Sequence, residues 1–273
     1  MEPPAHADRI KNAFLGAQKK GRAALVAYIC GGDPSPETSA ACAAALLEVG
    51  VDILEIGVPF SDPLADGETN QLAAQRALAA GMNRGRLFKL ASDLRKKFPR
   101  TPVVLYTYYN LVLARGLEAF ARDCREAGVD GILTLDLPPE EAAPLDSACR
   151  AQGIANIYIV APTTPEARIR EIAARATGFI YYVSQEGVTG ERRELAANLA
   201  EKIAAIKRHT PLPVVAGFGI STPEHIAKAG ACADGVVVGS ALVRVIAENA
   251  ATPGAIPLAL SAKIHHLLGG KSA

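Results

Sequence analysis

Residues 52–67 have the sequence DILEIGVPFSDPLADG, an apolar run followed at once by a loop rich in proline and acid. The first part, DILEIGV, is apolar at nearly every position, which is typical of a strand in a parallel sheet covered on both faces. Similar runs recur along the chain and predict further strands at 24–29, 102–108, 131–137, 156–160, 179–184, 213–218 and 234–240.

Amphipathic, alanine-rich stretches separate these runs and predict helices. They cover residues 36–50, 69–81, 86–98, 116–128, 139–153, 165–176, 194–209 and 222–230. Eight strand–helix units in about 250 residues fit a closed (β/α)8 TIM barrel better than an open sheet. We therefore expect residues 1–273 to form a single α/β barrel domain with an extra N-terminal helix.

Three segments of the chain resemble one another: EVGVDILEI, EAGVDGILT and KAGACADGVVV. Each contains a helix end, a glycine and an aspartate shortly before a strand. Glycine suits the left-handed residue that follows many helices. We interpret the similarity as three good turns between helix and strand.

The composition indicates a soluble globular protein with a large core, since 49% of the 273 residues are hydrophobic and the net charge is +1. Balanced charge argues against a nucleic-acid or anionic-membrane partner. The N-terminus MEPPAHADRI has no apolar segment typical of a signal peptide, and no apolar run is long enough to span a membrane. Five scattered cysteines predict reduced thiols and a cytoplasmic location.

Three acids in residues 55–66 are the first candidates for chemistry. Glu55 lies inside a core strand, where burial of an isolated carboxylate is costly and raises its pKa toward a range useful for proton transfer. Asp66 follows in the loop, beside Gly67, and either faces the same cavity or serves as a turn residue. Asp62 precedes Pro63, so turn formation explains it nearly as well as function does.

Two glycine-containing turns predict a phosphate site. AGFGIST closes the seventh strand and VVVGSAL closes the eighth, which places Gly217, Gly219 and Gly239 where a ligand approaches the backbone of a barrel. We expect Ser240 to begin a short helix, whose first N–H groups attract an anion. The alternative is that these are simply tight turns.

The loop SQEGVTGERRE after the sixth strand is polar, and Gly187 and Gly190 could act as hinges of a lid or belong to an idle surface loop. No predicted strand contains a lysine for a Schiff base, and the histidines lie in helices or near the termini. Carboxylates, tyrosines and a phosphate cradle, without a metal or a covalent amine, suit proton transfer on a phosphorylated substrate.

Several motifs together resemble those of tryptophan synthase α subunits over nearly the whole chain. They are GGDPSPE, LEIGVPFSDPLADG, YYN, SQEGVTGE, GFGIST and ADGVVVGSAL, in this order. The resemblance implies a (β/α)8 barrel that cleaves indole-3-glycerol phosphate to indole and glyceraldehyde 3-phosphate without a cofactor. It also implies a cytoplasmic α2β2 heterotetramer, in which indole passes to a β subunit that carries pyridoxal phosphate.

The resemblance assigns roles to individual residues. Glu55 matches the catalytic glutamate and Asp66 the catalytic aspartate, while Asp62 falls where the family contacts the β subunit. Thr189 is expected to reach Asp66 when the site closes. The expected substrate-binding residues are Tyr28 and Tyr106 as apolar walls of the indole pocket, Tyr181 near the substrate, and Gly190, Phe218, Gly219, Gly239 and Ser240 at the phosphate.

The sequence departs from the family pattern at two places. Glu68 stands where proline is usual, which we expect to loosen the loop that carries Asp66. Gln185 and Glu186 stand where an arginine is often found, which we expect to alter lid dynamics or the response to the partner. Three alternatives stay open: another phosphate-binding barrel enzyme such as an isomerase, a stand-alone indole-releasing lyase, and a catalytically silent partner subunit.

Overall fold

The computed structural model describes residues 6–183, 192–217 and 219–270. Eight parallel strands form a closed barrel in which each strand pairs with the next and β8 pairs with β1. The strands are β1 (Ala24–Cys30), β2 (Ile53–Gly57), β3 (Val103–Thr107), β4 (Gly131–Thr134), β5 (Ala155–Val160), β6 (Ile180–Val183), β7 (Val214–Gly217) and β8 (Gly235–Val238). The expected TIM-barrel fold is confirmed.

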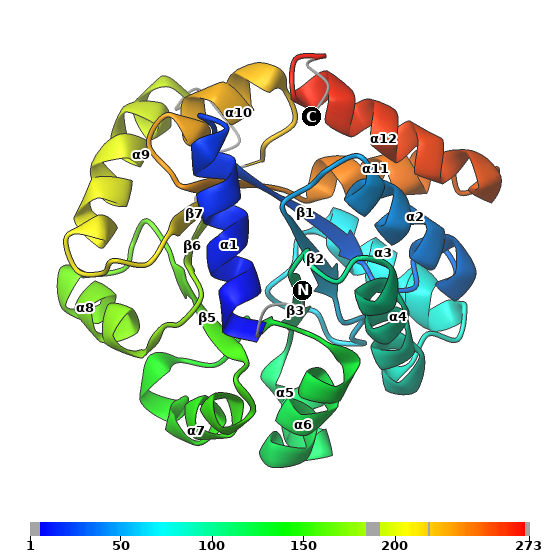
Figure 1. Cartoon of the computed structure of the whole chain (residues 1–273), viewed down its shortest axis with the longest axis horizontal. Coiled ribbons are helices and arrows are strands. Elements are labelled where there is room, and N and C mark those ends of the chain that lie inside the picture. Colours follow the sequence, from blue (N-terminus) through cyan, green and yellow to red (C-terminus); the bar gives the residue numbers. More distant parts are fainter. Residues whose placement is uncertain (1–5, 184–191, 218, 271–273) are drawn as a thin grey trace.

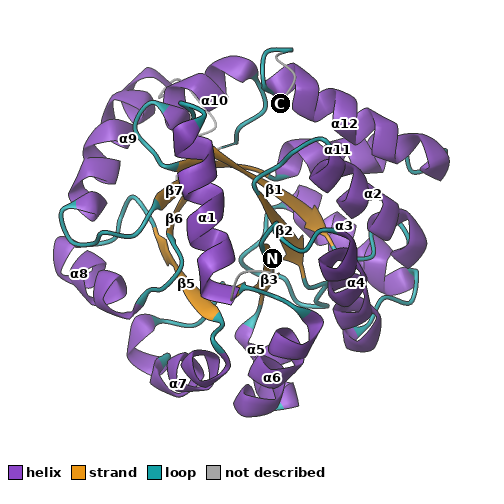
Figure 2. Ribbon diagram, in the orientation of Figure 1, coloured by secondary structure: helices purple, strands orange, loops and turns teal. Residues whose placement is uncertain are grey.

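Helices surround the strands on all sides (Figure 2). They are α1 (His6–Lys19), α2 (Pro36–Glu48), α3 (Glu68–Ala79), α4 (Arg84–Lys97), α5 (Tyr109–Arg115), α6 (Leu117–Ala127), α7 (Ala143–Gln152), α8 (Glu166–Arg175), α9 (Arg192–Lys207), α10 (Pro223–Gly230), α11 (Ser240–Glu248) and α12 (Ile256–Leu267), with short 3-10 turns at Pro139–Glu141 and Pro253–Ala255. Helices α5 and α12 were not expected from the sequence. None of the helices in these described ranges is both long and apolar enough to cross a membrane.

The expected N-terminal helix, α1, lies across the end of the barrel at which the strands begin (Figure 1). Its Phe14 packs edge-to-face on Phe179, just before β6, with the ring centroids 5.7 Å apart. Ile10 and Phe14 are both buried. Because α1 closes this end with apolar side chains, a ligand is expected to reach the barrel from the opposite end, where the strands finish.

The three similar segments share a contact beyond their turns. Asp52, Asp130 and Asp234 each stand just before a strand and accept a hydrogen bond from the N–H at or near the start of the preceding strand. The donors are Leu25 (2.7 Å), Val103 (2.7 Å) and Val214 (2.8 Å), respectively. Each aspartate also pairs with a cation. We call these contacts the aspartate staples, which join β1 to β2, β3 to β4 and β7 to β8.

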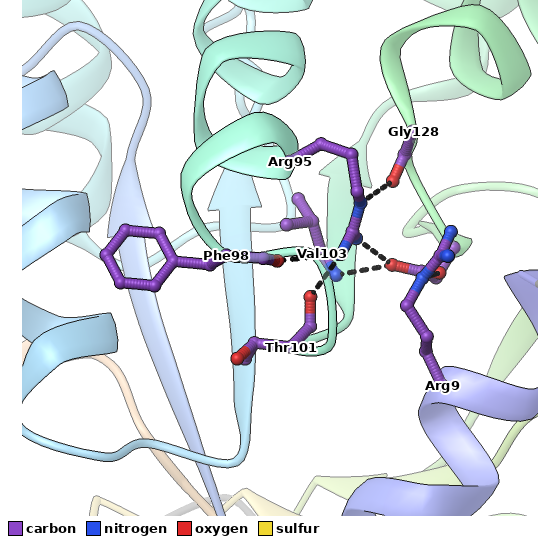
Figure 3. Close-up of polar contacts among 7 residues, drawn as sticks. Arg9, Arg95, Phe98, Thr101, Val103 and Gly128 are labelled. Carbon is purple, nitrogen blue, oxygen red and sulfur yellow. Dashed lines mark hydrogen bonds and ion pairs between the residues drawn. The ribbon is translucent and has the colours of Figure 1, made fainter. Parts of the chain in front are cut away.

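Figure 3 shows the contacts of the middle staple, whose aspartate is the most buried of the three. Asp130 is fully buried and pairs with Arg9 from α1 and Arg95 from α4, each at 2.6 Å. Arg95 also donates to the backbone carbonyls of Phe98, Thr101 and Gly128. One carboxylate thus fixes α1 and α4 against the start of β3.

The prediction that a left-handed glycine follows the helix in each of these three segments is only partly right. Gly50 and Gly128 have positive φ, 92° and 76°, after α2 and α6. Gly230 instead ends α10, and Ala231 follows in a right-handed conformation. The expectation for Gly230 was wrong because the chain keeps right-handed geometry for one residue more before it turns toward β8.

Candidate active site

Glu55 lies in the middle of β2, beside Tyr28 of β1 and Val104 of β3 in the sheet register. Its side chain is buried, with the residue only 1% exposed. Neither carboxyl oxygen has a hydrogen-bond partner among the described residues. Burial, and secondarily the negative charge of Asp66, raise the pKa of Glu55 to about 8. The group therefore holds a proton at neutral pH, and no partner among the described residues accounts for its position.

Asp66 lies in the loop between β2 and α3 and receives three hydrogen bonds from side chains in the described part of the chain. The Tyr106 hydroxyl donates to Oδ1 at 2.9 Å, and the Tyr108 hydroxyl donates to Oδ2 at 2.8 Å. The Asn70 side-chain amide donates to Oδ1 at 3.3 Å. The Tyr108 hydroxyl also accepts from the Ala65 backbone N–H at 3.0 Å, so it holds the loop as well as the carboxylate.

The loop geometry bears on Glu68, which was expected to loosen it. Glu68 is the exposed first residue of α3, with Gly67 as the N-cap. A carboxylate near the N-terminus of a helix is electrostatically favourable. The preceding turn is closed by the bond from the Asp66 N–H to the Pro63 carbonyl at 3.0 Å. The loop is thus held by contacts that do not need a proline at position 68.

A cavity of about 190 Å³ opens next to Glu55 at the end of the barrel opposite α1. Its walls come from β1, β2, β3, β6, β7 and β8 and from the segments that follow them. The lining residues are Tyr28, Glu55, Asn70, Tyr106, Tyr181, Val183, Gly217, Gly219, Ile220, Val237, Gly239 and Ser240. Asp66 borders this cavity through its bonds to Asn70 and Tyr106.

Three tyrosines give the cavity flat, mostly buried walls. The rings of Tyr28 and Tyr106 meet edge-to-face with centroids 5.0 Å apart. A side chain at Gly217 would place Cβ 2.6 Å from the Tyr181 hydroxyl, so this glycine makes room for the ring. The expectation that Tyr106 is an apolar wall was incomplete, because its hydroxyl binds Asp66.

The two glycine turns meet at the same cavity, as expected. Gly219 has φ +42°, a conformation that favours glycine. Gly239 is the N-cap of α11, and Ser240 is its first residue. The first N–H groups of a helix have no partner within it and carry partial positive charge, which suits an anion.

The structure gathers most of the expected site residues and adds two. Glu55, Tyr28, Tyr106, Tyr181, Gly219, Gly239 and Ser240 line one cavity, while Asp62 is exposed on the loop after β2. Thr189, Gly190 and Phe218, as well as Gln185, Glu186 and Gly187, lie outside the described residues. The additions are Asn70 and Tyr108. Asn70 lies in the first turn of α3 and Asp66 in the loop before it, so no local pattern indicated their contact.

A second, larger cavity of about 930 Å³ lies at the opposite end of the barrel, beside α1. Its carboxylate, Asp234, is already bound to Lys207 and to the Val214 N–H. This second cavity therefore has no described carboxyl group as available for proton transfer as Glu55 is in the first. In the described part of the chain, no group of three histidine, cysteine or acidic side chains is placed to hold a metal ion.

Comparison with known proteins identifies the family. Residues 14–264 match the family model described as tryptophan synthase alpha chain. The chain is 57% identical over 262 residues to the tryptophan synthase alpha chain of Opitutus terrae, covering 96% of this chain and 98% of that one.

Two solved structures extend the comparison to the fold. Tryptophan synthase subunit alpha of Legionella pneumophila is similar with a TM-score of 0.85 and 35% identity, covering 95% of this chain and 98% of that one. A chain of the tryptophan synthase α2β2 complex of Pyrococcus furiosus has a TM-score of 0.79 and 36% identity, covering 90% of this chain and 97% of that one. The chain belongs to the tryptophan synthase alpha chain family.

Proposed function

We propose that Glu55 and Asp66 together carry out the α reaction of tryptophan synthase, the cleavage of indole-3-glycerol phosphate to indole and glyceraldehyde 3-phosphate. The observation that carries this proposal is the buried Glu55 carboxyl, which has no described partner and lines the cavity. Because the chain belongs to the tryptophan synthase alpha chain family, the alternative of an isomerase is set aside.

In this mechanism the Glu55 carboxyl donates its proton to C3 of the indole ring, the carbon that carries the glycerol chain. The resulting carboxylate then removes the proton of the glycerol hydroxyl on C3′. The bond between C3 and C3′ breaks, its electron pair returns to the ring, and C3′ becomes the aldehyde carbon. Glu55 ends the cycle protonated, so a single carboxyl group serves both proton transfers.

Asp66 has a different task in the same cycle. Protonation of C3 makes the ring cationic, with charge near its N–H group. A carboxylate that accepts this N–H stabilises the charge as it develops. The three donors around Asp66 hold its carboxylate in one orientation beside the cavity. This division of work explains why one acid lies inside the strand and another in the loop beyond it.

The direct test is to mix the protein with indole-3-glycerol phosphate and to measure indole, with and without its cognate β subunit. Indole release supports the proposal. Release that does not respond to the β subunit would favour the stand-alone lyase. No release under either condition would favour the silent partner subunit.

The phosphate is proposed to bind at Gly219, Gly239 and Ser240. The three described atoms nearest to a Cβ on Gly239 all belong to Tyr28, at 3.4 Å or more, so the fold has room for a Cβ there. Gly239→Val is therefore expected to keep the fold but to weaken binding of glycerol phosphate, by about tenfold or more, which is ~1.4 kcal/mol. Calorimetric titration of glycerol phosphate measures the effect.

Gly254→Val is the control for this substitution, since nothing lies within 4 Å of a Cβ at that surface position. Its affinity for glycerol phosphate is expected to equal that of the unmodified protein. Equal affinities for Gly239→Val and the unmodified protein would place the phosphate elsewhere.

The β subunit is proposed to dock on the loop after β2. Asp62 is exposed there, and Leu64 is 90% exposed, unusually open for a large apolar side chain. This loop also carries Asp66, so a partner seated on it can bias the active-site geometry. We propose that this chain assembles as an α2β2 heterotetramer, as the complex from Pyrococcus furiosus does.

Asp62→Ala is expected to leave indole release by the isolated chain within about twofold. It should reduce activation by the β subunit by about fivefold or more, the lower end of typical coupling between sites. Indole release at rising β-subunit concentration measures both quantities. Asp93→Ala, at an exposed aspartate on α4, is the control. Identical activation curves for Asp62→Ala and Asp93→Ala would remove Asp62 from the interface.

A further inference from the structure

The three donors around Asp66 are not distributed evenly over its two oxygens. Oδ1 accepts from Tyr106 at 2.9 Å and from Asn70 at 3.3 Å, whereas Oδ2 accepts from Tyr108 at 2.8 Å. A carboxylate offers about four lone-pair positions, two on each oxygen. Among the described residues, side chains therefore occupy both positions on Oδ1 and one of the two positions on Oδ2.

The direction of the Asn70 amide follows from its neighbour. An ionised carboxylate accepts hydrogen bonds only, so the group facing Asp66 must be the Asn70 Nδ2 donor. The Asn70 Oδ1 is then left buried without a partner among the described residues. A buried acceptor without a partner costs stability. Among the described residues, the Asn70 side-chain amide therefore makes its polar contact to Asp66 through Nδ2.

Tyr106 differs from Tyr108 in what its hydroxyl does. Tyr108 also holds the Ala65 N–H and so fixes the loop, whereas Tyr106 lies within the cavity and its hydroxyl contacts Asp66. Burial, followed by the charge of Asp66, raises the pKa of Tyr106 well above its usual value. Its hydroxyl thus stays protonated and able to donate over the working pH range.

We propose that Tyr106 and Asn70 are positioning residues for Asp66: their hydrogen bonds to Oδ1 fix the carboxylate in the orientation in which it accepts the ring N–H of the substrate. This inference rests on the proposed function, because it deepens the role given there to Asp66. Neither residue needs to touch the reacting carbon. Their contribution is recognition of the N–H group and stabilisation of the cationic ring.

The test compares two ligands that differ only at the ring nitrogen. One is an indole carrying a three-carbon alkyl phosphate, which cannot be cleaved because it lacks the glycerol hydroxyls. The other is its benzothiophene counterpart, in which sulfur replaces N–H. The unmodified protein is expected to prefer the indole by about tenfold or more, the range for a hydrogen bond to a charged group.

Tyr106→Phe and Asn70→Leu are each expected to lower this preference by about threefold or more, a partial loss of that bond. The double variant should bind the two ligands nearly equally. Tyr182→Phe is the matched control, since Tyr182 follows Tyr181 on β6, does not line the cavity, and its hydroxyl makes no hydrogen bond to Asp66 among the described residues. The preference of this variant for the indole ligand should match that of the unmodified protein.

The outcomes separate this inference from the proposed function. If Tyr106→Phe and Asn70→Leu weaken the binding of both ligands equally, the two residues only support packing, and the inference is overturned. Asp66→Asn, measured in parallel, tests the role of Asp66 itself. If Asp66→Asn also keeps the full preference for indole, the contact between Asp66 and the ring N–H is wrong, and the proposed role of Asp66 falls with it.

Discussion

Glu55→Gln is expected to lower the turnover of indole-3-glycerol phosphate by about 10²–10⁴-fold, the usual range for loss of a general acid–base group. Glutamine fills nearly the same space but cannot donate a proton to C3 or accept one from the hydroxyl. Substrate binding should persist, because the phosphate and ring contacts come from other residues. Single-turnover measurement of indole release checks the rate, and near-normal release would remove Glu55 from the mechanism.

The pH dependence of the unmodified enzyme tests the same assignment. The pKa of Glu55 is raised to about 8, so the proton needed at C3 is present below that pH and is lost as pH rises through it. Turnover of bound substrate should therefore fall at alkaline pH. The residual activity of Glu55→Gln should not show this fall at alkaline pH. If both proteins show the same fall, the titrating group is one other than Glu55.

The pH dependence of the free energy of unfolding gives an independent check on Glu55. An ordinary glutamate titrates near pH 4.5, whereas Glu55 in the folded protein titrates near 8. Between these values the unfolded chain has released a proton that the folded chain keeps. The free energy of unfolding should fall by about 1.4 kcal/mol per pH unit across this window. Denaturant titrations should show that Glu55→Gln lacks this contribution and is still folded.

Asp66→Asn is expected to lower turnover by about 10²–10³-fold, with much less effect on substrate affinity. The magnitude is that of losing one preorganised electrostatic contact to a transition state. Asparagine keeps an acceptor oxygen for the ring N–H but loses the negative charge that opposes the cationic ring. Separate determination of kcat and of the dissociation constant distinguishes these effects. Weaker binding with unchanged turnover of bound substrate would make Asp66 a binding residue only.

The fold was largely predictable because the strands carry a strong local signal. Seven residues of β1 and five of β2 are buried without interruption, which matches their continuous apolar sequences. Helix α5 was missed because Tyr108, Tyr109 and Asn110 resemble a polar loop after β3. Helix α12 was missed because it follows the last strand–helix unit. It packs on α2 and α11 (Figure 1), contacts that no local pattern encodes.

The site was predictable where a single residue contradicts its surroundings. Glu55 is an acid in an apolar strand, and this conflict points to function without any structure. The hydrogen bonds from Tyr106 and Asn70 to Asp66 were not predictable in the same way. It depends on how the loop after β2 folds over the end of β3, which is set by contacts between elements far apart in the sequence.

The aspartate staples also have a consequence for how the chain can be divided. The staple partners described above for Asp52 and Asp130 precede β5, and those for Asp234 follow it. A break in the backbone between β4 and β5 would leave every staple inside one fragment. A break between β3 and β4 would separate Asp130 from Arg9, Arg95 and the Val103 N–H. The segment between β4 and β5 is therefore the preferred site for dividing the chain in fragment complementation or circular permutation. Each of the two fragments then keeps its own aspartate staples.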